Sequence, residues 1–459
     1  MENIKKTILQ MLVVIASICI YSSCSGDDYI NTIPGNSNAL ISVDIKKTAT
    51  QFGNDNNSSI IESLFHTKNA EDCGIDLDSK LYFYETTEGN LGCCAKVNDE
   101  DALKDWLNEL SRQGLCNKVT ERREMCYSLL RNSWAICFNS KSLLLMGPIL
   151  PAQEADAIRT LSRCLKQKED DGIKATPLYE KIDSINSPVS IVAQVDALPE
   201  KIAAPFTIGA PKEADASQII IAASIDTGKN GCLKISGESF SFNSSINKAL
   251  KEGTGKFRKL NGRYINNMPG NTLCSIFMNV NGKEFVKMLH NSTGLGMLLA
   301  GMNTAIDMDN ILKSVDGDMM IGVNSYSENN IKMTMAAQLA QHGFLKDVDY
   351  WKKSCPDGSS ITDWGHNSFC FKSGDTNFWF GVSDSNEFYG STDKATAIGI
   401  LKPSPAPLSS ELRKTISEQR FCMALNIRQI ITENKEYSTI TDMLAPLFGK
   451  INYVIYCIK

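Results

Sequence analysis

The sequence has little histidine and lacks the motifs on which metal and nucleophilic chemistry usually depend. Its 459 residues include four histidines, and none belongs to an HExxH pattern, which would place two metal ligands on one helix face. There is no GxSxG turn to expose a serine nucleophile and no CxxC pair. Gly253-Thr254-Gly255-Lys256 lacks the first glycine of a phosphate-binding loop, because Leu250 stands in its place. We therefore expect no catalytic residues, no metal and no cofactor.

The chain also lacks an excess of positive charge and a long apolar run. Its formal net charge is −5 at pH 7, and the charges are dispersed. A nucleic-acid binder usually carries a basic patch or stripe, so we expect no nucleic-acid partner. The apolar run Ile8–Ile20 has thirteen residues, which as a helix rise only about 20 Å, short of the roughly 30 Å of a bilayer core.

The first residues have the order of an export signal. Lys5 and Lys6 precede the apolar run Ile8–Ile20, and Tyr21-Ser22-Ser23-Cys24 places small residues before a cysteine. The cut site resembles a lipobox, the lipoprotein signal-peptidase motif, although an aliphatic residue usually stands where Tyr21 does. We predict a signal peptide at 1–23 and lipidation of Cys24, which would attach the protein to a membrane. The alternative is an ordinary signal peptide with a chance cysteine.

A short acidic tether, residues 24–28, follows the cut. Ser25-Gly26-Asp27-Asp28 resembles the export signal that sends Bacteroidetes-type lipoproteins to the outer face of the outer membrane. We expect an outer-membrane lipoprotein of the cell envelope, exposed at the surface, with a periplasmic position as the alternative.

The fifteen cysteines do not form a recognisable disulfide framework. Cys19 lies in the signal peptide and Cys24 would carry lipid, which leaves an odd number. Several of the others lie inside apolar runs, where cysteine behaves as a small hydrophobe, and we expect most of them to be buried. Cys355 and Cys370 could close a loop.

The sequence contains an internal repeat. Tyr29–Asn36 (YINTIPGN) reappears as Tyr264–Asn271 (YINNMPGN), with six of eight positions identical. Weaker matches follow in the same order, and they are Gly74–Asp78 with Ala305–Asp309, Asn132–Trp134 with Asn377–Trp379, and Ala204–Phe206 with Ala445–Leu447. We predict two divergent tandem copies, 29–262 and 263–459, the second shortened at its C-terminus.

Local patterns predict helices and hairpins in each copy. Four apolar stretches run directly into Asp44, Asp196, Asn281 or Asn426, whose side chains could cap a following helix. Turn-like residues separate 80–85 from 91–97 and 319–325 from 331–337, and helices are expected at 99–112 and 151–168. This mixture predicts an α+β fold, with a largely antiparallel sheet in each copy covered by helices on one face.

Two acidic motifs and one aromatic-rich segment are the candidates for binding. Asp76-Leu77-Asp78 and Asp307-Met308-Asp309 alternate like the start of a calcium loop but do not continue as one, so we expect them to cap loops. Between Trp351 and Tyr389 the chain is rich in aromatic residues that could stack on sugars, although core packing explains most of them. Trp364, in a Gly/Asp/Asn-rich segment, is the candidate ligand-binding ring.

The lipoprotein start, the Tyr29–Pro34 opening and the Ala39–Asp44 strand together resemble one family. It is the Bacteroidetes lipoprotein family known as domain-of-unknown-function family 4836, and the resemblance covers nearly the whole chain after the signal. It implies an envelope lipoprotein and supplies no activity or catalytic residue.

These patterns favour a binding or scaffolding component over an enzyme. Its partners would be the membrane, through the lipid anchor, and an envelope protein or glycan. The alternative is an envelope hydrolase for glycan or peptide, whose carboxylates converge only in the fold and would have raised pKa values.

Overall fold

The structure is a computed structural model, and it describes residues 26–51, 70–122, 124–198, 204–211, 213–228, 231–291, 306–327, 330–374, 376–433 and 450–458. The chain divides into two compact units, Met1–Lys47 with Asn56–Ser184 and Thr48–Asp55 with Ile185–Lys459. The main division therefore falls at 184–185, whereas the sequence repeat predicts a boundary between copies at 262–263.

The first unit is built on an antiparallel sheet. Its strands are β1 (Ser37–Val43), β2 (Leu81–Thr86), β3 (Leu91–Lys96), β4 (Thr120–Arg122), β5 (Met125–Leu130), β6 (Trp134–Phe138) and β7 (Ser142–Gly147). They pair in the order β1-β2-β3-β7-β6-β5-β4. Helices α4 (Glu100–Arg112), α5 (Glu154–Cys164) and α6 (Pro177–Asp183) accompany this sheet, and α2 (Ile45–Gln51) follows β1.

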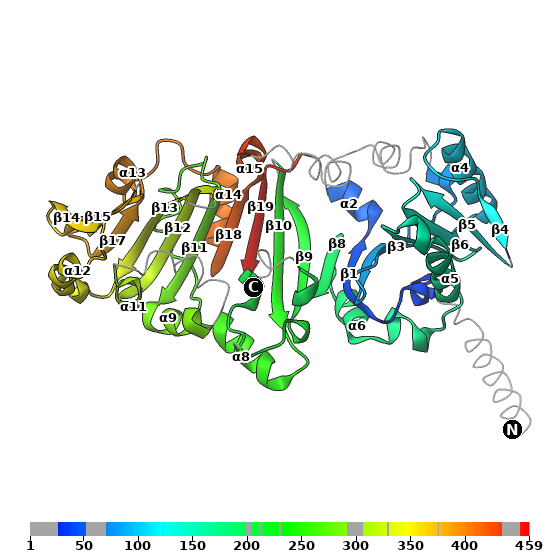
Figure 1. Cartoon of the computed structure of the whole chain (residues 1–459), viewed down its shortest axis with the longest axis horizontal. Coiled ribbons are helices and arrows are strands. Elements are labelled where there is room, and N and C mark those ends of the chain that lie inside the picture. Colours follow the sequence, from blue (N-terminus) through cyan, green and yellow to red (C-terminus); the bar gives the residue numbers. More distant parts are fainter. Residues whose placement is uncertain are drawn as a thin grey trace, which may run out of the picture. The chain divides into compact units, whose positions relative to one another are not determined.

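The second unit is built on a wider sheet (Figure 1). Its strands are β8 (Val189–Gln194), β9 (Ile220–Gly228), β10 (Cys232–Phe240), β11 (Cys274–Asn281), β12 (Val315–Ser327), β13 (Asn330–Leu339), β14 (Ser359–Gly365), β15 (Ser368–Ser373), β16 (Thr376–Val382), β17 (Glu387–Ser391), β18 (Phe421–Asn426) and β19 (Tyr453–Ile458). Their order is β8-β9-β10-β19-β18-β11-β12-β13-β17-β16-β15-β14. Among these described strands the β10–β19 pair is parallel and the other pairs are antiparallel.

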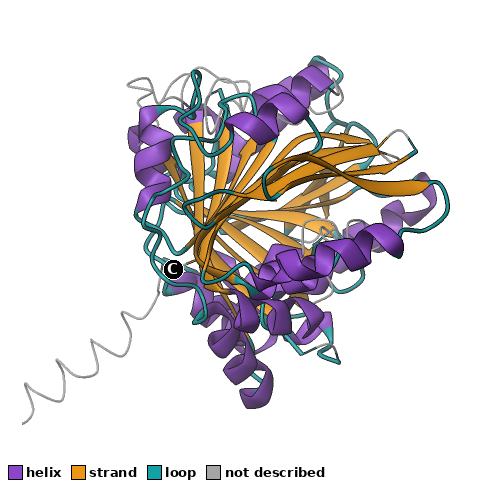
Figure 2. Ribbon diagram, turned by 90° about the vertical axis from the view of Figure 1, so that its left-hand side faces the viewer, coloured by secondary structure: helices purple, strands orange, loops and turns teal. Residues whose placement is uncertain are grey.

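Helices lie on both faces of this second sheet, which corrects the expectation of one covered face (Figure 2). They are α8 (Ser244–Thr254), α9 (Gly282–Asn291), α11 (Met308–Lys313), α12 (Val348–Lys353), α13 (Lys394–Gly399), α14 (Ser410–Ser417) and α15 (Ile427–Glu433). Ile276 and Met278 of β11 pack in one core with Ile311 of α11, whereas Phe277 packs in the other core with Leu412 of α14. Neighbouring strand residues point to opposite faces, so a continuous apolar run such as β11 requires two covered faces.

The strand order of the first unit recurs in the second. β1-β2-β3-β7-β6-β5-β4 corresponds to β11-β12-β13-β17-β16-β15-β14, and all of these pairs are antiparallel. The helices follow the same pattern, because α5 contacts β6 and β7 while α13 contacts β16 and β17. The two sheets therefore share a topology as well as short sequence motifs.

The repeated Tyr-Ile-Asn motif makes the same backbone contact in both places. The amide of Ile173 donates to the carbonyl of Ile33 at 3.0 Å, and the amide of Leu408 donates to the carbonyl of Met268 at 3.2 Å. Both partners in the second contact lie 235 positions after those in the first, from 33 to 268 and from 173 to 408. Next to these bonds lie the β-bridges Pro34–Gly172 and Pro269–Pro407.

Helix capping largely follows the sequence prediction. The side chains of Asp44, Asn281 and Asn426 accept hydrogen bonds from the backbone amide three residues later, at 2.9, 3.3 and 3.1 Å. Asp196 lies instead in a single 3₁₀ turn, Val195–Ala197. Asp99 caps α4 through bonds from two backbone amides, so the expected helix over 99–112 is confirmed.

Most of the thirteen described cysteines are buried, as their apolar surroundings predict. Cys355 and Cys370, which the sequence could have joined, are both free, and the Cys355 sulfur contacts the carbonyl of Trp351 at 3.3 Å. Among the described helices, none combines the length and apolar character needed to cross a membrane.

Candidate functional site

The predicted anchor lies mostly outside the described residues. The signal peptide 1–23, Cys24 and Ser25 belong to that part of the chain. Gly26 and Asp27 lead directly into a 3₁₀ helix, Asp28–Thr32, and the carbonyl of Asp27 accepts a hydrogen bond from the Ile30 amide at 3.1 Å. The folded body therefore starts within a few residues of the predicted lipidation site.

Trp364, the candidate ligand-binding ring, lies on β14 and is half-buried. Its indole N–H donates to the carbonyl of Phe369 at 2.9 Å. Tyr389 meets the ring edge-on at a centroid distance of 6.4 Å, and the Lys394 ammonium lies 5.6 Å from the ring centroid. The ring thus already has contacts within the protein that hold its orientation.

Most of the other aromatic side chains in this segment are core residues, as their alternation predicts. The buried ones are Trp351, Phe369, Phe378, Phe380 and Phe388. Phe371, Trp379 and Tyr389 are half-buried. The high aromatic content therefore mainly reflects packing under β14–β17 and does not form an exposed aromatic platform.

The alternating acidic residues serve as caps. Asp307 accepts a bond from the Asn310 amide at 2.9 Å and begins α11. Asp76 accepts bonds from the Asp78 amide and the Ser79 hydroxyl and pairs with Lys96 at 2.9 Å. Within the residues that the structure describes, no group of three or more His, Cys, Asp or Glu side chains is placed to hold a metal.

A pocket of about 1010 Å³ lies in the second unit. It is lined by Pro269–Asn271 of the repeated motif, by Ser404–Pro407, and by residues of α14, α15 and the start of β19. This volume is at the upper end of the range typical of small-molecule sites. Hydroxyl and amide side chains supply much of the lining.

The repeated motif forms a fixed wall of this pocket. The carbonyl of Gly270 accepts hydrogen bonds from the Asn426 amide group and the Tyr453 hydroxyl, both at 3.1 Å, while its N–H donates to the carbonyl of Ala406 at 2.8 Å. A Cβ at Gly270 would lie 3.0 Å from the carbonyl oxygen of Pro407, so the close approach favours glycine. Three segments distant in sequence therefore meet at one residue.

The pocket has few charged groups. Glu411 and Arg428 are the charged side chains in its described lining. Burial, with a contribution from Glu411, raises the pKa of the Cys232 thiol to about 12, which keeps it protonated and a poor nucleophile. Burial also raises the pKa of Tyr453, although Arg428 opposes that shift. These groups suit hydrogen bonding to a ligand better than acid–base chemistry.

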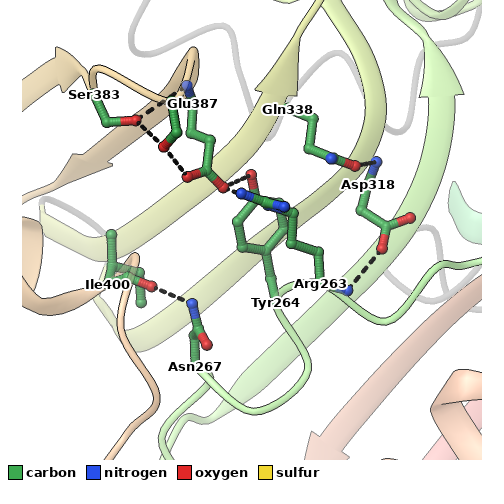
Figure 3. A network of polar contacts seen from close by, with 9 residues as sticks. Arg263, Tyr264, Asn267, Asp318, Gln338, Ser383, Glu387 and Ile400 are labelled. Atoms are coloured by element: carbon green, nitrogen blue, oxygen red, sulfur yellow. Dashed lines mark hydrogen bonds and ion pairs between the residues drawn. The ribbon is translucent and has the colours of Figure 1, made fainter.

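A buried carboxylate lies elsewhere in the second unit, at the start of β17. Glu387 accepts hydrogen bonds from Arg263 Nε at 2.6 Å, the Tyr264 hydroxyl at 2.9 Å and the Ser385 hydroxyl at 2.7 Å (Figure 3). Burial alone would raise its pKa, but these three donors together hold the pKa of Glu387 below its usual value. Glu387 therefore stays ionised and fastens the segment before β11 to the sheet.

Asp318 of β12 continues this network. Its carboxylate accepts from the backbone amides of Asn261 and Arg263 at 3.0 and 2.9 Å and from the Asn279 side chain at 2.9 Å. Its own amide donates to the Gln338 side chain at 2.9 Å (Figure 3). Both carboxylates accept several hydrogen bonds, and Glu387 also pairs with the Arg263 guanidinium, so both hold the structure together.

The first unit has an apolar hollow of about 300 Å³ on its sheet. Ala39 and Ile41 of β1 line it together with Trp134. Phe83 and Leu91, which also line it, are 38% and 43% exposed. Large exposed apolar side chains gathered in one place are more typical of an interaction surface than of scattered surface residues.

Sequence reasoning missed both hollows. The repeat singled out Pro269-Gly270-Asn271, and the proline- and serine-rich stretch 402–409 was a further signal, but their meeting with α15 and β19 depends on the sheet order. The network around Glu387 and Asp318 has no sequence signature, because its members come from separate elements.

Comparison with known proteins gives a family match without an activity. The sequence model of the family described as "Domain of unknown function (DUF4836)" matches residues 29–432. No curated protein matches. Two solved structures, of crystal forms III and IV of TP0453, are 9% identical and cover 82% and 81% of this chain and 97% and 96% of their own, each with a TM-score of 0.26. At this TM-score the similarity supports no conclusion about function.

Proposed function

The chain belongs to the DUF4836 family, and from this premise we propose that it is a lipoprotein of the cell envelope that acts as a binding or scaffolding component. Cleavage before Cys24 and lipid on that cysteine attach it to the outer membrane. The short segment 25–28, with the acidic residues Asp27 and Asp28, directs it to the outer face, with the periplasmic face as the alternative. The sequence of the first 24 residues supports the anchor, and the short tether holds the folded body close to the membrane.

The body consists of two duplicated α+β copies, 29–262 and 263–459. The shared strand order and the paired Ile33–Ile173 and Met268–Leu408 bonds support this part of the proposal. β9 and β19 occupy corresponding places in the two copies, because they pair antiparallel with β8 and β18. Because β10 pairs with β19, the end of the first copy lies in the same compact unit as the second.

The pocket of about 1010 Å³ is the observation that carries the binding role. A hydrolase would need two carboxylates in a cleft, one of them with a raised pKa. Glu411 is the carboxylate in the described lining of the pocket. Wherever a carboxyl pKa is shifted in the described chain it is lowered, and these groups are Asp76, Glu88, Asp215, Glu284, Glu387 and Asp393. The chemistry therefore favours holding a ligand, an envelope glycan or protein, over cleaving one.

The anchor is tested by replacing Cys24 with alanine and separating membranes from soluble fractions. We expect Cys24→Ala to leave the membrane fraction because the lipid attachment atom is gone. Cys19→Ala is the matched control, since Cys19 lies in the segment removed by cleavage, and it should stay membrane-bound. Equal membrane retention of both variants would contradict lipidation at Cys24.

The binding role is tested by photo-crosslinking in cells. A photoreactive phenylalanine analogue replaces Gln429 in the pocket, Leu91 at the apolar hollow, or Asp384, an exposed turn residue between β16 and β17. Mass spectrometry should find a reproducible adduct, glycan or protein, at Gln429, and at Leu91 if the hollow contacts a protein. Adducts at Asp384 as abundant as those at Gln429 would contradict a pocket-directed partner. In the same assay, the analogue in place of Trp364 tests whether the partner also contacts that position.

A further inference from the structure

Two of the buried cysteines face each other across neighbouring strands. Cys422 of β18 and Cys457 of β19 are directly opposite in the antiparallel register, and their sulfur atoms lie 3.6 Å apart. Both side chains are fully buried, in the core that contains Leu412 and Ile416 of α14. Their placement distinguishes them from Cys93 and Cys94, which are neighbours in sequence and point to opposite faces of β3.

The distance between the two strands suits a disulfide. Directly opposed residues in an antiparallel pair have Cα atoms about 4.5–5.5 Å apart, which lies within the roughly 4.4–6.8 Å that a disulfide spans, and bonded sulfur atoms lie about 2.05 Å apart. The sulfur atoms would have to approach by roughly 1.5 Å, a movement that side-chain rotation and a small strand adjustment can supply.

We propose that Cys422 and Cys457 are a disulfide site that closes when the chain folds in the presence of a disulfide donor, such as a thiol oxidase or oxidised glutathione. The thiolate of one cysteine attacks the donor disulfide, forms a mixed disulfide and releases the first donor thiol. The thiolate of the other cysteine then attacks the protein sulfur of that mixed bond, and the second donor thiol leaves. The two cysteines lose two electrons and two protons, and the donor gains them.

The bond would fasten the closing strand of the fold. β19 lies between β18 and β10, so it joins the β9–β10 hairpin to the remaining strands of the second unit. A covalent link to β18 closes a loop from 422 to 457 and restricts the unfolded chain. The stabilisation should therefore appear mainly as a higher unfolding temperature of the second unit.

The burial of both thiols also determines when the bond can form. Reaction requires a thiolate and access to the donor: burial raises the pKa of Cys422 well above its ordinary value, whereas the hydrogen bond between the two thiols lowers the pKa of Cys457, so access is the main barrier in the folded chain. The core around α14 shields the sulfur atoms from a bulky donor once folding is complete. The site should consequently oxidise during folding and resist oxidation afterwards.

The experiment refolds the purified full chain with either oxidised glutathione or a reducing agent, then maps tryptic peptides by mass spectrometry. The two cysteines fall in separate short peptides, Phe421–Arg428 and Ile451–Lys459, and each peptide has a single cysteine. We expect these peptides to be linked, two hydrogen atoms lighter than their sum, after oxidative refolding and separate after reduction. Adding oxidised glutathione to the folded, reduced chain should give little of the linked product.

Thermal unfolding provides a second readout. Oxidative refolding should raise the unfolding temperature by roughly 5–10 °C for the wild type and for Cys355→Ser, the matched control, and should not raise it for Cys457→Ser. Because the peptide map uses the wild-type chain, it needs no variant that folds. Free thiols on both peptides after oxidative refolding, or a link from Cys422 to a different cysteine, would overturn the proposal whether or not the chain is exported.

Discussion

Replacing Glu387 with glutamine removes the charge at the centre of the network that fastens the segment before β11 to the sheet. The variant keeps the size of the side chain and one acceptor oxygen, so packing changes little. It weakens the hydrogen bond from Arg263 Nε, which is 2.6 Å long in the wild type, and leaves the guanidinium without a carboxylate partner. The Tyr264 hydroxyl keeps an acceptor only if the glutamine oxygen points toward it.

The expected loss of stability in Glu387→Gln depends on how far the two paired side chains are buried. Hydrogen bonds that involve a charged group contribute about 1.5–3 kcal/mol, more than neutral ones. The Arg263 side chain is 46% exposed, so solvent recovers part of the loss, whereas the Glu387 side chain is 10% exposed. We expect Glu387→Gln to lower the free energy of unfolding by about 2 kcal/mol, which for a unit of this size lowers the unfolding temperature by about 5 °C.

Asp316→Asn is the matched control. Asp316 pairs with Arg258 at 2.8 Å in the same region, but the two side chains are 42% and 48% exposed, so the change should cost less than about 1 kcal/mol. Thermal unfolding followed by circular dichroism, with urea titration for the free energies, measures both variants. Equal losses in Glu387→Gln and Asp316→Asn, or no loss in Glu387→Gln, would refute the argument from burial.

Three further predictions concern pH, capping and backbone conformation. Because the pKa of Glu387 is lowered in the folded protein, the ionised carboxylate stabilises the fold at pH values above its unfolded pKa of about 4.5, and this stabilisation is lost as the pH falls through the folded pKa. The unfolding temperature should therefore fall less steeply between pH 6 and pH 3 in Glu387→Gln than in the wild type. Parallel slopes in the two proteins would contradict this. Asp99→Ala removes the α4 cap and should lower the free energy of unfolding, measured by urea titration, by about 1 kcal/mol. Asp101→Ala is the control and should change it little, because the Asp101 side chain is 93% exposed. Gly74→Ala should lower the free energy of unfolding by roughly 3 kcal/mol or more, because an added Cβ would clash with the carbonyl oxygen of Asp99 and Gly74 has a φ of +66°. A variant as stable as the wild type would rule out that clash.

The local features of the fold could be predicted from the sequence because short-range chemistry decides them. Asp99 and Asp307 are caps because their carboxylates reach amides within three residues. The hairpins β2–β3 and β12–β13 follow from apolar runs separated by turn residues. The aromatic residues Phe378 and Phe380 share a strand face because side chains alternate.

The long-range pairings could not be predicted in this way. β10 and β19 pair in parallel across more than two hundred residues, and no local pattern specifies that partner. The pocket depends on it, because β19 brings Tyr453 to Gly270. Helices were expected on one sheet face, although the continuous apolar run of β11 already indicated two buried faces.

The mass of the N-terminal peptide of the protein purified from its native membrane tests the central claim most directly. A lipid-anchored envelope protein predicts that the first residue is Cys24, carrying a diacylglyceryl group on its sulfur and an acyl chain on its amine. A chain that still begins at Met1, or one that has been cut but has an unmodified Cys24 thiol, would contradict it.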